Sequence, residues 1–64
     1  MRNTFTTLQF VKLLKTAGYK VDRTEPFTEQ RRKLFDFIKE NYGDKLPFFA
    51  LKSDMQVKSI IERI

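Results

Sequence analysis

The chain of 64 residues contains no cysteine, no histidine and no tryptophan, and only two glycines and two prolines. Without cysteine there is no disulfide, and without cysteine or histidine a zinc site is essentially excluded. The apolar run LPFFAL is far too short to span a bilayer, and no stretch has the pattern of a signal peptide. We therefore expect a cytoplasmic protein with no metal, no other cofactor and no membrane contact.

Residues that most enzymes use are scarce as well. Histidine and cysteine are missing, and Gly18 and Gly43 stand alone, so there is no glycine-rich phosphate loop. Each carboxylate has a basic residue within four positions, which is typical of a solvated surface. We expect that the chain is not an enzyme and has no small-molecule substrate.

The length is enough for one domain, residues 1–64. A chain this short buries only about 60% of the surface that its unfolded form exposes, so its stability is marginal. Seven phenylalanines and two tyrosines supply much of the core volume. A homodimer would be another source of buried area.

The first helix is predicted over residues 7–17. The stretch FTTLQF carries a capping box, Thr6 with Gln9, and its two phenylalanines are spaced as a hydrophobic staple. Gly18 stands where the C′ residue of a helix belongs.

Two further helices are predicted, over residues 29–42 and 54–64. Thr28 would cap the first of them and Gly43 would end it. A second capping box begins at Ser53, and apolar residues then recur at helical spacing to the end of the chain.

Two stretches favour short extended segments. Residues 19–23 alternate apolar with polar side chains, and residues 47–51 are almost wholly apolar. The expected fold is therefore mainly α: a compact three-helix domain of helix-turn-helix or winged-helix-like type, with one or two short β segments.

The phrase LLKTAGYKV, followed after a gap by TEQRRKLFDFI, resembles the opening of winged-helix repressors of the ferric-uptake-regulator type. In that family a KxAGxKxT phrase leads into xQRxxILxxL on the next helix. The resemblance covers residues 13–38 and implies a winged-helix start. The family's metal-binding histidines and cysteines have no counterpart here.

The net charge of +5 is concentrated at one end of the chain. Residues 1–23 hold five basic residues against Asp22 alone, and the first helix has no carboxylate. Such a surface suits phosphate contacts, although a solvated lysine-bearing helix is the alternative. The expected phosphate-binding residues are Lys12, Lys15, Lys20, Arg23 and Arg31.

The cationic triplet RRK at the start of the second helix is partly neutralised by its neighbours. Glu29 precedes Lys33 by four residues, and Arg32 precedes Asp36 by four. Arg31 has no evident local partner, so it is the cation of the triplet that we expect to reach a phosphate.

On the third helix, Gln56, Ser59 and Arg63 form a row at helical spacing. Glutamine pairs well with adenine and arginine with guanine in the major groove, and the last helix of a trihelical domain often reads bases. The alternative is an ordinary solvated row.

Phe48 and Phe49 are adjacent, and neighbours on a regular strand face opposite sides. One of these rings would then be partly exposed and could form a protein interface. The alternative is a loop that tucks both rings under the helices.

These observations favour a small basic nucleic-acid-binding protein, a DNA-binding transcriptional regulator or accessory factor of the kind that phages and mobile elements encode, acting as a dimer. DNA is favoured over RNA because no aromatic-studded sheet for stacking bases is evident. The alternative is a protein-interaction module, an inhibitor or adaptor of a larger enzyme or a homodimerising domain, that uses the aromatics at Phe48 and Phe49.

Overall fold

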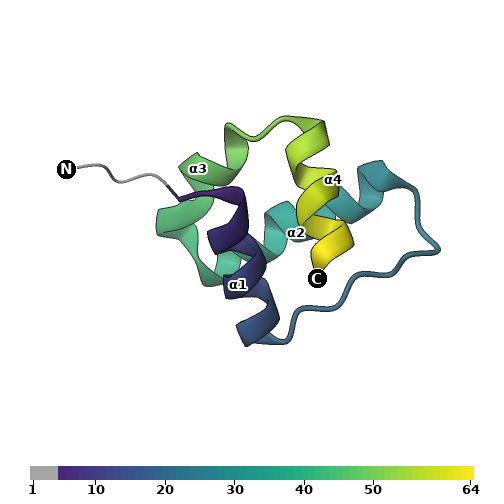
Figure 1. The fold of residues 1–64 in the computed structure, drawn as a ribbon, viewed down its shortest axis with the longest axis horizontal. Coiled ribbons are helices and arrows are strands. Elements are labelled where there is room, and N and C mark those ends of the chain that lie inside the picture. Colours follow the sequence, from purple (N-terminus) through teal and green to yellow (C-terminus); the bar gives the residue numbers. More distant parts are fainter. Residues whose placement is uncertain (1–4) are drawn as a thin grey trace.

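The computed structural model describes residues 5–64, and within them the chain is mainly helical and has no strand (Figure 1). A short 3₁₀ turn, η1 (Gly43–Lys45), joins the second helix to the third. The four helices are α1 (Thr7–Ala17), α2 (Phe27–Asn41), α3 (Leu46–Ala50) and α4 (Asp54–Arg63). The mainly α fold is thus confirmed, and none of the helices in the described residues combines the length and apolar character needed to cross a bilayer.

Helix α1 has the predicted bounds because both of its ends are capped as expected. Thr6 Oγ1 accepts from the backbone N–H of Gln9 at 3.2 Å, and Gln9 Oε1 accepts from the N–H of Thr6 at 2.7 Å. At the other end Gly18 has a φ of 75°, and its N–H donates to the carbonyl groups of Leu14 and Lys15.

We expect Gly18→Ala to destabilise the protein by about 1 kcal/mol, because a Cβ is disfavoured in the left-handed conformation. Nothing lies within 4 Å of the position that the new Cβ would take, so the cost is conformational rather than steric. Gly43→Ala is the matched control: its φ is not positive and its surroundings are equally open. Urea unfolding of both variants would contradict this account if Gly43→Ala proved the more harmful.

Helix α2 begins two residues earlier than predicted, at Phe27 instead of Glu29. Pro26 takes the N-cap position, where its φ of −64° suits the entry, and its carbonyl accepts from the N–H of Gln30 at 3.1 Å. Thr28 therefore lies inside the first turn, and no side chain caps this helix.

The predicted β segments are wrong. Residues 47–51 belong to α3 and the turn after it, and Pro47 stands in the first turn of that helix, where its missing N–H costs nothing. Residues 19–23 lie in the irregular connection between α1 and α2. Gly43 also differs from expectation, since it opens η1 instead of ending α2 in a left-handed cap.

The helical conformation of α3 changes the reading of its two phenylalanines. On a helix, adjacent side chains point about 100° apart, so one can be central to the core and the other at its border. Phe49 is fully buried and packs edge to face against Phe10, with ring centroids 5.5 Å apart. Phe48 is half-buried. Phe49 therefore belongs to the core, contrary to its expected place in an interface.

All four helices contribute to a core of nine buried apolar side chains. Tyr19 and Phe37 extend it where the end of α1 lies near α2, with ring centroids 4.6 Å apart. The nine are Phe10, Val11, Leu14, Leu34, Ile38, Phe49, Val57, Ile60 and Ile61.

Candidate nucleic-acid interface

Helices α1 and α4 pack against each other and run in the same direction (Figure 1). At their N-terminal ends, Lys52 Nζ donates to the carbonyl oxygen of Phe5 at 3.1 Å. At their C-terminal ends, Arg23 Nη2 donates to the carbonyl oxygen of Ile61 at 2.9 Å. These two long-range hydrogen bonds fix the relative position of the helices from both ends.

One flank of α4 faces α2. Arg31 Nε lies 3.3 Å from Asp54 Oδ1, and Lys58 Nζ lies 5.1 Å from the centroid of the Phe27 ring. At about 100° per residue, the predicted base-reading row stands about 150° around α4 from Asp54 and Lys58, on the other side of the buried stripe. The row is therefore directed toward the α1 side: Gln56, Ser59 and Arg63.

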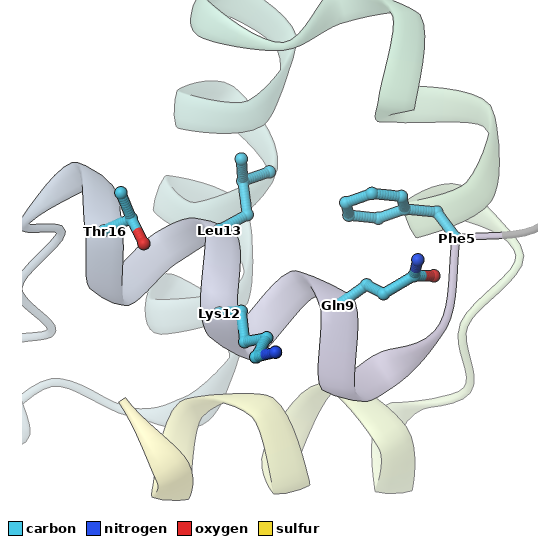
Figure 2. Close-up of a pocket in the computed structure, with 5 residues that line it drawn as sticks. All are labelled: Phe5, Gln9, Lys12, Leu13 and Thr16. Atoms are coloured by element: carbon cyan, nitrogen blue, oxygen red, sulfur yellow. The ribbon is translucent and has the colours of Figure 1, made fainter.

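The direction of Leu13 shows which side of α1 faces α4. Figure 2 shows Leu13 projecting from the side of α1 that is away from α4. At about 100° per residue, Leu8 and Lys15 project about 140–160° from Leu13, and so toward α4. Both are exposed, Leu8 to 61%. Lys12 is also exposed and lies between this flank and that of Leu13.

The first-helix lysines and the row on α4 thus share one side of the molecule, which we call the α1–α4 face. It comprises Lys12, Lys15, Gln56, Ser59 and Arg63. None of these residues is acidic; Glu62 borders the face, about 60° around α4 from Ser59 and about 100° from Arg63. A one-signed surface with hydroxyl and amide donors among its cations is suited to phosphate oxygens.

Hydrogen bonds within α4 restrict part of the row. Gln56 Oε1 accepts from the backbone N–H of Ser53 at 3.0 Å, which completes the predicted capping box. A bidentate contact to adenine needs this oxygen as well as the amide nitrogen, so the cap would have to open. Arg63 Nε donates to Ser59 Oγ at 3.3 Å, and the terminal nitrogens of Arg63 make no hydrogen bond within residues 5–64.

The two basic residues of the α1–α2 connection differ in what they contact. Lys20 is exposed. Arg23 binds the Ile61 carbonyl, one of the acceptors that the C-terminal turn of α4 leaves without an intrahelical partner. One terminal nitrogen of the Arg23 guanidinium is therefore occupied by a contact that holds the connection against the end of α4.

Arg31 is separate from this face. It has no ion-pair partner on its own helix within the described residues, but Asp54 pairs with it across the α2–α4 contact, so it is not the unpaired cation that we expected to reach a phosphate. The pair has no hydrogen bond through Nε, which is buried, and the Arg31 side chain is 36% exposed. Sequence proximity could not reveal a partner on another helix.

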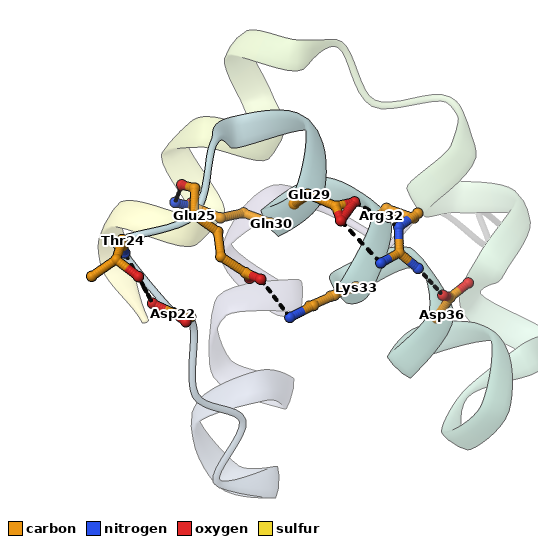
Figure 3. A network of polar contacts seen from close by, with 8 residues as sticks. All are labelled: Asp22, Thr24, Glu25, Glu29, Gln30, Arg32, Lys33 and Asp36. Atoms are coloured by element: carbon orange, nitrogen blue, oxygen red, sulfur yellow. Dashed lines mark hydrogen bonds and ion pairs between the residues drawn. The ribbon is translucent and has the colours of Figure 1, made fainter.

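The other two cations of the triplet are neutralised near α2 (Figure 3). Arg32 contacts Asp36 at 3.2 Å, as predicted, and also binds Glu29 through two nitrogens at 2.9 and 3.2 Å. These bonds lower the pKa of the Glu29 carboxyl below its ordinary value. The predicted pairing of Glu29 with Lys33 is wrong.

Lys33 instead binds a carboxylate from the connection before α2. Its Nζ donates to Glu25 Oε2 at 2.7 Å, and this bond raises the pKa of the Lys33 ammonium (Figure 3). In the same connection, the hydroxyl and N–H of Thr24 donate to Asp22 Oδ1 and lower the pKa of the Asp22 carboxyl. This network holds more carboxylates than cations, unlike the α1–α4 face.

Sequence reasoning missed Lys52, whose ammonium lies at the N-terminal ends of α1 and α4. It is half-buried, bound to the Phe5 carbonyl, and lies 5.9 Å from the centroid of the Phe10 ring. No local pattern marks it, because its partners are more than 40 residues away along the chain.

Within residues 5–64, acidic side chains form no cluster suited to a metal ion.

Comparison with known protein families, curated proteins and solved structures gives no match to this chain. The charge and geometry of the α1–α4 face therefore provide the basis for a functional proposal.

Proposed function

We propose that this chain is a small DNA-binding protein, a transcriptional regulator or accessory factor, that places its α1–α4 face against duplex DNA. The observation that supports this proposal is the common orientation of Lys12, Lys15 and Arg63 on two parallel helices. Around Arg32 and Lys33 a phosphate would compete with the carboxylates of Glu25, Glu29 and Asp36, whereas Lys12, Lys15 and Arg63 have no carboxylate partner within residues 5–64.

The finer reading is a helix-turn-helix arrangement in which α4 is the helix nearest the bases. Three residues join α3 to α4, a length typical of this motif. Ser59 and Arg63 would contact base edges while the lysines of α1 contact the backbone. A dimer would present two such faces to successive half-sites.

The alternative, a protein-interaction module built on Phe48 and Phe49, has weaker support. Phe49 is fully buried and Phe48 is half-buried, so the pair does not offer an exposed aromatic patch. Within residues 5–64 the exposed large apolar side chains are elsewhere, at Leu8, Leu51 and Met55.

Fluorescence anisotropy of a labelled duplex of mixed sequence tests the proposal. Three neutralised phosphates give a salt slope of about −2.7, so raising the salt from about 50 to about 200 mM should weaken binding about 40-fold. A single-stranded RNA of the same length serves as the comparison. Absence of binding to the duplex at low salt, or affinity that does not change with salt, would exclude a phosphate-binding face.

A further inference from the structure

The outer side of α1 carries a shallow, open pocket next to the α1–α4 face. Its volume is about 300 Å³ and its accessible lining is almost wholly apolar. Figure 2 shows Phe5 and Leu13 at its two sides, with Gln9 and Lys12 along α1 between them. The lining residues are Phe5, Gln9, Lys12, Leu13 and Thr16. A pocket this small and open suits one side chain of a larger partner better than an enclosed ligand.

Contacts outside the pocket hold its Phe5 wall in place. The Phe5 ring packs edge to face on Phe10 with centroids 4.7 Å apart, and Lys45 Nζ lies 4.9 Å from the centroid of the same ring. The Phe5 carbonyl is bound by Lys52, and the adjacent backbone is fixed by the capping box of α1. A wall held in this way loses little conformational freedom when a partner binds.

The charge around the pocket has one predominant sign. Lys12 lines it, and none of the residues that line it is acidic. Lys45 lies beside the Phe5 ring, and its ammonium nitrogen is 3.5 Å from a carboxylate oxygen of Asp44. The complementary ligand is therefore an apolar side chain with a carboxylate close by.

We propose that this pocket, the Phe5–Leu13 pocket, binds an acidic peptide segment of a partner protein. The segment inserts one large apolar side chain between Phe5 and Leu13 and places an Asp or Glu carboxylate on Lys12. This inference does not depend on DNA binding, because the apolar lining of the pocket lies outside the α1–α4 face.

Selection from a displayed library of random peptides of about 12 residues, long enough for three helical turns, tests the proposal. The selected peptides should combine a large apolar residue with Asp or Glu within one helical turn. Thr16→Trp, which fills the pocket from an exposed position, should weaken their binding about tenfold or more, as should Lys12→Glu.

Leu51→Trp adds the same indole at a position that is 84% exposed and not among the pocket lining, and Lys39→Glu makes the same charge change on α2. Both controls should bind the peptides as the wild type does. The proposal is overturned if no peptide is enriched, if the enriched peptides lack acidic residues, or if Thr16→Trp, with helicity unchanged by circular dichroism, binds them undiminished. Lys15→Glu should retain peptide binding even where it impairs DNA binding, so the two proposals can fail separately.

Discussion

The Phe49→Ala variant is expected to be largely unfolded at 25 °C. Phe49 is fully buried between α1 and α2, with its ring 5.5 Å from that of Phe10 and 6.2 Å from that of Phe35. Truncation of such a ring costs about 3–5 kcal/mol. A single hydrophobic core in a chain of 64 residues rarely supplies more than about 3–5 kcal/mol, so this one substitution removes most or all of it. Far-ultraviolet circular dichroism during urea unfolding measures the loss.

Phe48→Ala is the matched control, because it removes the same ring one position earlier. Phe48 is only half-buried, so the variant should stay folded with a smaller loss of stability. Equal losses for the two variants would show that the core is not centred on Phe49. The comparison also separates a core role of these residues from the interface role that the sequence suggested.

The parts of the fold that could be predicted are those encoded by neighbouring residues. Helices α1 and α4 begin at capping boxes, in which a side chain and the backbone three residues away satisfy each other. The apolar spacing after each cap then identifies the buried side. Such signals depend on local geometry alone, and for this reason they persist in the folded chain.

The start of α2 and the whole of α3 were missed because their signals are ambiguous. Thr28 was the predicted N-cap, but Pro26 takes that position, which brings Phe27 into the helix and its ring within 5.1 Å of the Lys58 ammonium. The apolar stretch at residues 47–51 has no polar position to mark a period, so helix and strand cannot be distinguished.

The residues of the candidate site can be proposed from the sequence, but their contacts in the fold cannot. The lysines of α1 and the row on α4 were identified from their spacing, and the packing of α1 on α4 orients them to one side of the molecule. Arg31 and Arg23 are bound to Asp54 and to the Ile61 carbonyl, which are distant in sequence. Contacts of this kind are set by tertiary packing, which the pattern along the chain does not contain.

Reversing two charges of the α1–α4 face should abolish most DNA binding. Lys15→Glu with Arg63→Glu lowers the net charge from +5 to +1 and replaces two attractions to phosphate with two repulsions. Each unit of charge near a phosphate is worth on the order of 1 kcal/mol, so affinity should fall about 100-fold or more. The dependence of log affinity on log salt concentration should also become shallower, its slope moving toward zero by about two. Anisotropy titrations of duplex DNA at several salt concentrations measure both quantities.

The control changes net charge by the same amount at positions outside the α1–α4 face. Lys39→Glu with Lys58→Glu places the new carboxylates on α2 and on the flank of α4 that faces it. Both double variants must retain the helicity of the wild type by circular dichroism. If the protein binds DNA only through its overall charge, the two variants will lose affinity equally. A greater loss of affinity from the Lys15 and Arg63 substitutions is expected instead. Of the four substituted positions, only these two lie on the α1–α4 face.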